Sequence, residues 1–338
     1  MCIVPYALYI GSFTKRVLCI IMPNLTIIYL GPSDIAKELA KKGTESDITF
    51  YNLKRGNDTL TLVEPTRYPE KLSSLFFAAA LSDAALLVID EISAALGECI
   101  VMLDAAQIKS GYIMLRNYID IAMIAPLIAG TVLENYIYVS EDLTVLREDL
   151  LHAATSASAD ANGPPIVPID HHFNVKGIGT VILGCVAKGT VKKHDQLLVW
   201  PTKKVAQVRS IQKHDDDASE AYRGDRVGLA LKGVTAEELD RGYVLAPENM
   251  LIEAEEMRGQ LSPVQWWKQP LKEQMILYAG YWMQFSPCRV TSISEDAKNP
   301  DLTLVCNKPF VFDQGAEIVL HYLEGERLRI VGTFRPKI

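Results

Sequence analysis

The sequence predicts an α/β domain with a doubly wound sheet, followed by two β-barrels. Three observations support this fold class. Residues 22–152 alternate β-runs with helical segments, a pattern typical of a mainly parallel sheet. Residues 166–247 contain short β-branched runs separated by glycine turns, as small antiparallel barrels do. Residues 248–338 show a similar alternation, which predicts the second barrel.

Length and charge agree with several soluble domains. A chain of 338 residues with 49% hydrophobic and 22% charged residues is too long for one core and has an ordinary globular composition. The net charge of −7 argues against nonspecific coating of nucleic acid. Lys and Arg number 10 against 19 Asp and Glu over residues 22–160, 12 against 10 over 165–246, and 10 against 12 over 247–338. The middle barrel is therefore the one domain with a positive balance.

The first 21 residues are apolar, but they include Lys15 and Arg16. Neither half reaches the roughly 18 apolar residues that a membrane span requires. The charges follow the first apolar run instead of preceding it, which is unlike a signal peptide. We therefore expect residues 1–21 to lie outside the fold, and we expect a cytoplasmic protein without a membrane partner.

The cysteines form no C-x-x-C pair and have no histidine at metal-binding spacing. We therefore expect free thiols in a reducing compartment and no metal site. The six cysteines are Cys2, Cys19, Cys99, Cys185, Cys288 and Cys306.

In the first domain, hydrophobic runs alternate with longer helical patterns. The predicted strands span 25–30, 47–53, 59–64, 85–90, 112–116 and 136–140. The predicted helices span 33–42, 68–81, 97–109, 124–134 and 143–154. Ligands of such sheets bind at the carboxyl ends of the strands.

Residues 153–165 are small and polar and end in Pro164 and Pro165, which predicts a linker with a stiff exit. The barrel that follows has predicted strands at 180–186, 196–200, 206–212, 226–231 and 243–246. The last domain has predicted strands within 274–285, 288–293, 302–306, 316–322 and 327–335.

Four ordered motifs give the middle barrel a specific resemblance. They are I-D-H-H-F-N-V-K-G-I-G-T-V-I-L-G at 169–184, K-G-T-V-K-K-H-D at 188–195, R-G-D-R-V-G at 223–228 and D-R-G-Y-V-L-A at 240–246. The stretch resembles the second domain of translational GTPases, the elongation factor Tu superfamily, and is most similar to archaeal selenocysteine-specific elongation factors. More loosely, residues 308–316 and 328–332 resemble the third domain of that superfamily. The resemblance implies a translation factor that acts with transfer RNA or the ribosome.

The first predicted strand is followed by G-P-S-D-I-A-K-E at 31–38, where the superfamily has the phosphate-binding loop G-x-x-x-x-G-K-[ST]. Gly31 and Lys37 match this pattern. Ala36 replaces the second glycine, and its Cβ crowds a turn that must approach phosphates. Glu38 replaces the magnesium-binding hydroxyl, and its carboxylate repels a triphosphate.

The other nucleotide motifs have decayed in the same way. Residues 64–68 read E-P-T-R-Y where relatives carry D-x-P-G-H, and N-Y-I-D at 117–120 stands for N-K-x-D. Because phosphoryl transfer depends on positioning and electrostatics, we expect a pseudo-GTPase with no catalytic residue, and neither GTP nor magnesium as cofactor. The degenerate nucleotide-site candidates are Gly31, Asp34, Lys37, Asn117, Asp120 and Ser140. Alternatively, Asn117 and Ser140 cap helices.

Within the barrel, His171 and Arg226 match positions that selenocysteine-specific factors use to line the aminoacyl pocket. A guanidinium and an imidazole would favour an anionic selenol. Alternatively, either residue is an ordinary surface group of the barrel, and Arg226 simply pairs with Asp225 or Asp170. Turn residues of the same barrel are candidates for RNA contact or for an ordinary solvated face: Lys188, Lys192, Lys193, Lys203, Lys204 and Arg209.

Our leading hypothesis is a monomeric elongation factor-like protein that binds aminoacyl-tRNA or the ribosome through its barrels without cycling GTP. One alternative is an active GTPase with a rewired nucleotide site. Another is a protein scaffold that holds a second translation factor or a ribosome assembly intermediate.

Overall fold

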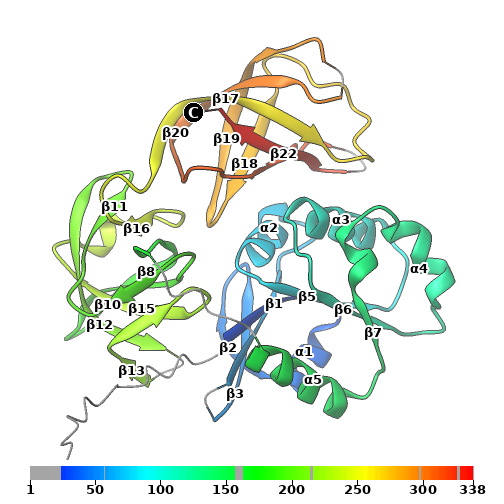
Figure 1. The fold of residues 1–338 in the computed structure, drawn as a ribbon, viewed down its shortest axis with the longest axis horizontal. Helices are drawn as coiled ribbons and strands as arrows, with labels where there is room; N and C mark the ends of the chain where they lie inside the picture. Colours follow the sequence, from blue (N-terminus) through cyan, green and yellow to red (C-terminus); the bar gives the residue numbers. More distant parts are fainter. Residues whose placement is uncertain are drawn as a thin grey trace, which may run out of the picture.

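The computed structural model describes residues 24–56, 58–156, 163–213, 216–296, 298–325 and 328–337. An α/β domain and two β-barrels follow one another along the chain (Figure 1), which confirms the predicted fold class. Residues 1–21 lie outside the described residues. Among the described residues, no helix is long and apolar enough to span a membrane.

The first domain is built on a mixed seven-stranded sheet. Five neighbouring strands of this sheet run parallel to one another. The two strands at one edge pair antiparallel, one with the parallel strand beside it and the other with the first of the two. In spatial order the strands are β2 (Lys41–Glu45), β3 (Thr49–Arg55), β4 (Asp58–Glu64), β1 (Asn24–Leu30), β5 (Ala84–Ile89), β6 (Gly111–Leu115) and β7 (Ile137–Val139).

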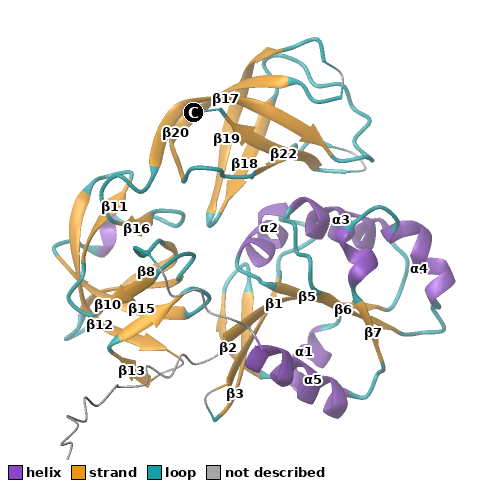
Figure 2. Cartoon of the chain, viewed as in Figure 1, coloured by secondary structure: helices purple, strands orange, loops and turns teal. Residues whose placement is uncertain are grey.

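Helices cover both faces of this sheet (Figure 2). Alternate residues of β1 point to opposite faces, as a strand requires. Ile27 packs in one core with α1 (Ser33–Leu39) and α5 (Leu143–Ser156). Ile28 packs in the other core with the remaining helices, which are α2 (Leu72–Ala80), α3 (Ala94–Ala105), α4 (Ile121–Ile128) and the 3₁₀ helix Val132–Asn135.

Several element bounds differ from the sequence-based expectation. α2 spans Leu72–Ala80 instead of 68–81, and α3 spans Ala94–Ala105 instead of 97–109. The first helix ends at Leu39, because Arg147 of α5 donates to the carbonyls of Glu38 and Leu39, and residues 41–45 then form the exposed edge strand β2. α4 begins at Ile121, where Asp120 accepts a hydrogen bond from the Met123 amide. α5 continues to Ser156, inside the predicted linker.

The first barrel closes through the pairing of β11 with β12. Its wall consists of β11 (Gln196–Trp200), β16 (Val244–Ala246), β8 (Val167–Val175), β9 (Gly179–Cys185), β15 (Arg226–Lys232) and β12 (Lys204–Lys213). Shorter elements complete it: β10 (Thr190–Lys192), β13 (Asp216–Ala218), β14 (Glu220–Tyr222) and the 3₁₀ helix Ala236–Glu238. Its core is aliphatic.

The second barrel is also closed. Its strands are β17 (Ile252–Pro263), β20 (Asp301–Phe312), β19 (Gln284–Ile293), β18 (Ile276–Tyr281), β21 (Ile318–His321) and β22 (Ile330–Pro336). The predicted run 274–285 is a hairpin rather than one strand, with Trp282 at its turn in a left-handed conformation (φ 49°).

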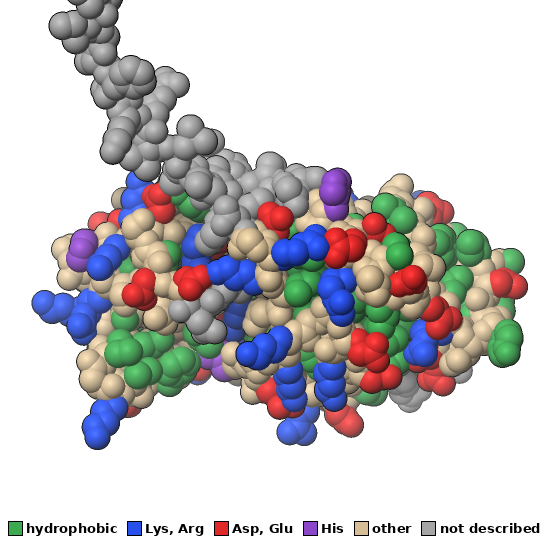
Figure 3. Space-filling view, turned by 90° about the horizontal axis from the view of Figure 1, so that it is seen from below, with side chains coloured by type: hydrophobic (Ala, Val, Ile, Leu, Met, Phe, Trp, Pro, Cys, Tyr) green, Lys and Arg blue, Asp and Glu red, His purple; other side chains and the backbone are tan. Residues whose placement is uncertain are grey.

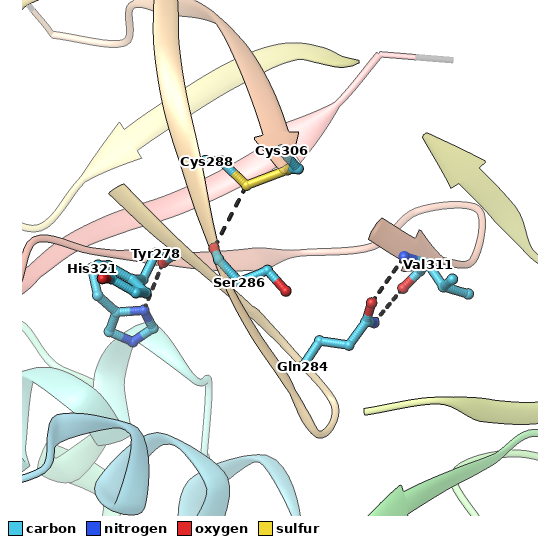
Figure 4. Close-up of a disulfide and its surroundings, with 7 residues drawn as sticks. All are labelled: Tyr278, Gln284, Ser286, Cys288, Cys306, Val311 and His321. Carbon is cyan, nitrogen blue, oxygen red and sulfur yellow. Dashed lines mark hydrogen bonds between the residues drawn. A yellow bond between two sulfur atoms is a disulfide. The ribbon is translucent and has the colours of Figure 1, made fainter. Parts of the chain in front are cut away.

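The expectation of free thiols is wrong for Cys288 and Cys306, which form a disulfide (Figure 4). The register of β19 and β20 places the two residues directly opposite each other, with their Cα atoms 4.1 Å apart. This pairing depends on the register of the two strands, so the spacing of the two cysteines along the chain does not predict it. Cys99 and Cys185 are free, and the other two cysteines lie outside the described residues.

Candidate functional site

A cavity of about 400 Å³ lies at the carboxyl ends of β1, β4 and β5, where such a sheet would bind a nucleotide. Three carboxylates line it, those of Glu64, Asp90 and Glu91. None of the described residues around it is a lysine or an arginine. The charge of this cavity therefore opposes a triphosphate.

The connection between β1 and α1 consists of only Gly31 and Pro32, because α1 already begins at Ser33. A Cβ on Gly31 would lie 2.6 Å from the Cβ of Val88, so packing against β5 requires glycine here. The Tyr29 hydroxyl donates to the Pro32 carbonyl at 2.6 Å, and burial raises the pKa of this phenol. The connection is thus a pinned turn instead of a loop that surrounds phosphates.

Glu64 stands where the superfamily has the aspartate of D-x-P-G-H, and it is buried. Its carboxylate accepts a hydrogen bond from the Tyr51 hydroxyl at 2.6 Å and another from the Ser33 hydroxyl. Both carboxylate oxygens are therefore used within the domain. In the described part of the chain, no group of three or more His, Cys, Asp or Glu side chains is arranged for a metal ion. The residues of this crevice do not fit magnesium-bound GTP.

Lys37, which matches the phosphate-loop pattern, and Ala36, which stands in the place of its second glycine, both lie within α1. Lys37 is exposed, and so is Asp34 in the first turn of the helix, whereas Ala36 is fully buried in the core. Neither Lys37 nor Asp34 lines the cavity, whereas Gly31 does. The structure thus brings only Gly31 of these candidates to the crevice.

The candidates for base recognition lie beyond β6 and β7. Asn117 Nδ2 donates to the carbonyl of Asp90 at 3.3 Å, and Asp120 caps α4. Ser140 is exposed directly after β7. Arg116 joins these loops because it pairs with both Asp90 and Glu141, each at 3.2 Å. Asp120 therefore has a capping role, and Asn117 ties two loops together.

The two aminoacyl-pocket candidates meet on one carboxylate. Asp170 is buried, and it binds His171 Nδ1 at 2.9 Å and the guanidinium of Arg226. Burial alone would raise the pKa of Asp170, but Arg226 and His171 outweigh it and hold the pKa below its usual value. The pairing of β8 with β9 shifts register between Ile169 and His171, and such an irregularity can redirect a side chain, here that of Asp170. The structure thus confirms the pairing of Arg226 with Asp170 that the sequence left open.

Arg226 also contacts the first domain. Its guanidinium carbon lies 3.5 Å from the ring centroid of Phe50 in β3. Its Nη2 is buried and has no hydrogen-bond partner among the described residues. A buried guanidinium nitrogen without a partner is costly, and the Phe50 ring covers this guanidinium, so a ligand could reach the nitrogen only if the first domain moved off the barrel.

A second cation at the domain interface was absent from the sequence-based candidates. Arg241 Nη1 binds Asp47 of the first domain at 2.8 Å, and Lys71 binds the same carboxylate at 2.8 Å. Burial would raise the pKa of Asp47, but the two cations lower it to about 2. Arg241 lies within the D-R-G-Y-V-L-A motif, so the motif was the available signal. An open cavity of about 1040 Å³, which Arg67 also lines, adjoins this cluster.

Most of the basic turn residues contact acceptors within the chain. Lys188 pairs with Asp313 of the second barrel, and Lys203 pairs with Glu253 at 3.0 Å. The other contacts are Lys204 with Glu238 at 2.5 Å and Arg209 with the Ile178 carbonyl at 3.0 Å, whereas Lys192 and Lys193 are exposed. Four of the six candidates therefore already bind acceptors within the chain.

The chain is similar in sequence to several known proteins. The family described as elongation factor Tu domain 2 matches residues 179–246. An uncharacterized protein of Methanocaldococcus jannaschii is 37% identical over 92% of this chain and 99% of its own length. The selenocysteine-specific elongation factor of the same organism is 34% identical over 64% of this chain, which spans 50% of that protein.

Solved structures share the fold. The translation elongation factor SelB of Methanococcus maripaludis in its apo form superimposes with a TM-score of 0.76 at 22% identity, covering 94% of this chain and 80% of that one. The same protein in complex with the GTP analogue GppNHp gives a TM-score of 0.78 at 21% identity, with the same coverage. Three domains in this order are therefore the shared architecture.

Proposed function

Because the chain belongs to the translational GTPase superfamily and is related to selenocysteine-specific elongation factors, we propose that it is an elongation factor-like protein that binds aminoacyl-tRNA through its barrels without cycling GTP. The observation that carries this proposal is the contrast between two sites. In the crevice of the first domain, the carboxylate of Glu64 is hydrogen-bonded to Tyr51 and Ser33. The first barrel, in contrast, holds His171 and Arg226 on the buried carboxylate of Asp170.

The barrel site supports recognition of an aminoacyl end. Asp170 fixes the positions of His171 and Arg226, so neither side chain must be ordered when a ligand binds. The unpartnered Nη2 of Arg226 would become a donor for a carbonyl or an anionic side chain once the first domain moves off the barrel, because the guanidinium is stacked on Phe50. The cations that line the interdomain cavity, Arg67, Lys71 and Arg241, are matched there by Glu45, Asp47 and Glu70, so this support rests on the barrel site alone.

The first domain supports loss of nucleotide cycling. A phosphate-binding loop needs consecutive backbone N–H groups that face the phosphates, and here a two-residue turn leads directly into α1. Glu64, in the place of a magnesium-linked aspartate, is hydrogen-bonded to Tyr51 and Ser33. We also propose a cytoplasmic location, where charged transfer RNA is found.

Filter binding with aminoacylated and deacylated transfer RNA tests the proposal. We expect the aminoacylated form to bind more tightly, and we expect Arg226→Gln to weaken it by about tenfold, as loss of a charged hydrogen bond does. Lys232→Gln is the control, because Lys232 is exposed in the same strand as Arg226 and the change should alter affinity less than twofold. Affinity no higher than that for bulk RNA would refute the proposal.

A further inference from the structure

The carboxyl edge of the sheet in the first domain bears an unusual exposed apolar surface. We call Ile92, Tyr118, Ile121 and Met123 the α4 surface, and they are 45%, 104%, 52% and 47% exposed. The sequence of α4, I-A-M-I-A-P-L-I, is apolar throughout, yet only Ile124 and Ile128 are buried. Apolar patches of this kind on a folded chain mark interaction sites.

The backbone that presents this surface is strained. Asn117 and Tyr118 adopt successive left-handed conformations, with φ of 51° and 63°, which bulky residues rarely do. The Asn117 side chain contributes a hydrogen bond to the Asp90 carbonyl, but the Tyr118 side chain is fully exposed to solvent among the residues that the structure describes. Strain of this kind clusters at binding sites, and here a ligand would supply the missing contacts of the tyrosine ring.

Acidic side chains surround the α4 surface. Glu91 and Asp120 are exposed, and the Glu141 side chain is 58% exposed. Arg116 pairs with both Asp90 and Glu141, so its charge is already balanced. Hydrophobic and acidic side chains also predominate at the right-hand end of the molecule in Figure 3, the end at which α4 lies in Figure 1.

The acidic cavity of about 400 Å³ opens beside this surface, because Asp90 and Glu91 line it and Ile92 follows them in the chain. Glu64 and Asp90 of this cavity are bound within the domain. Glu91 is exposed, and its carboxylate favours an ammonium or guanidinium group over any phosphate. The chemistry of cavity and surface together therefore matches a ligand that is basic and apolar, and it excludes an RNA backbone.

We propose that the α4 surface docks a basic, amphipathic segment of a partner protein, whose apolar residues cover Tyr118, Ile121 and Met123 while one lysine or arginine enters the acidic cavity. The site occupies the edge at which a nucleotide would bind in related sheets. A protein segment thus takes the place of the nucleotide as the ligand of the first domain. This inference does not depend on transfer RNA binding by the barrels.

Fluorescence anisotropy with the full chain tests the docking, using a labelled amphipathic peptide of leucine and lysine and its leucine–glutamate counterpart. We expect only the basic peptide to bind. The double variant Ile121→Ser, Met123→Ser and the single variant Tyr118→Asn should each weaken it by about tenfold, and Glu91→Gln by about threefold. Asparagine tolerates the left-handed conformation, so Tyr118→Asn remains informative if the double variant fails to fold.

Matched controls lie on the second barrel. Ile276 is 40% exposed and Glu295 is exposed, so Ile276→Ser and Glu295→Gln should change affinity less than twofold. Hydrogen exchange should show protection by the peptide within residues 116–128. No binding of the basic peptide, equal binding of the acidic one, equal losses in the controls, or displacement of the peptide by bulk RNA would each overturn the proposal.

Discussion

The guanidinium of Arg226 in the first barrel stacks on the ring of Phe50 in β3 of the first domain, with its central carbon 3.5 Å from the ring centroid. Phe50 is 1% exposed and belongs to a core cluster of the first domain. The candidate aminoacyl pocket is therefore part of a domain interface. Access to Arg226 depends on how closely the first domain lies against the barrel.

The stacking of Arg226 on Phe50 should be measurable as a coupling energy. A double-mutant cycle with Phe50→Leu and Arg226→Gln in urea unfolding should give a coupling of about 1 kcal/mol, as expected for a partly desolvated cation and an aromatic ring. Phe310→Leu, at a buried phenylalanine of the second barrel, is the control and should be additive with Arg226→Gln. A coupling near zero for Phe50 would contradict the role of this contact.

His321 should make stability depend on pH. It is fully buried between Phe76 and Phe285, and burial lowers its pKa from 6.5 to about 4. Between these values the unfolded chain binds a proton that the folded chain does not, so stability falls as pH decreases from 6.5 to 4. The whole shift corresponds to roughly 3 kcal/mol.

His321→Phe removes this titration. The free energy of unfolding of the parent chain should therefore fall relative to that of the variant as pH decreases through this window. Parallel stability curves for the parent chain and His321→Phe would show that the buried histidine is protonated without penalty.

The nucleotide site should not be restored by repairing its motif. Ala36→Gly with Glu38→Thr recreates the pattern of a phosphate-binding loop, but α1 would still begin at Ser33 and Glu64 would still bind Ser33 and Tyr51. Ala36 is also fully buried, so its loss should cost about 1 kcal/mol of stability. Calorimetry with GTP and magnesium should show no binding at micromolar nucleotide, and a clear binding heat would contradict this prediction.

The disulfide between Cys288 and Cys306 should stabilise the second barrel. Crosslinks with loops of this size, at a separation of 18 residues, contribute about 3 kcal/mol by restricting the unfolded chain. The double variant Cys288→Ser, Cys306→Ser should lose this stabilisation in urea unfolding under oxidising conditions. Treatment of the parent chain with dithiothreitol should give a similar loss, whereas no difference between oxidised and reduced chain would contradict it.

Local sequence patterns were sufficient for the fold class but not for the contacts between domains. The alternation of Ile27 with Ile28 and the glycine turns of the first barrel are local signals, and they led to the correct layers. β17 carries several glutamates, so its pattern is weak by itself, and it forms because β20 and β22 pair with both of its edges.

The local motifs of the candidate site could be predicted from the sequence, whereas its contacts between domains could not. His171 and Arg226 lie in recognisable motifs, and Asp170 precedes His171 within the first of these motifs. The residues that pair across the domain interface are far apart in the chain. Asp47 and Arg241, for example, have a sequence separation of 194. A contact over such a separation depends on domain packing, which no local pattern encodes.

The most direct test of nucleotide-independent binding is the affinity for aminoacyl-tRNA measured with and without GTP and magnesium by equilibrium filter binding. The proposed function predicts specific binding of the charged RNA with the same dissociation constant, within twofold, in both conditions. Binding that appears only with GTP, or that becomes more than tenfold tighter with it, would contradict the proposal and show that the first domain still responds to nucleotide.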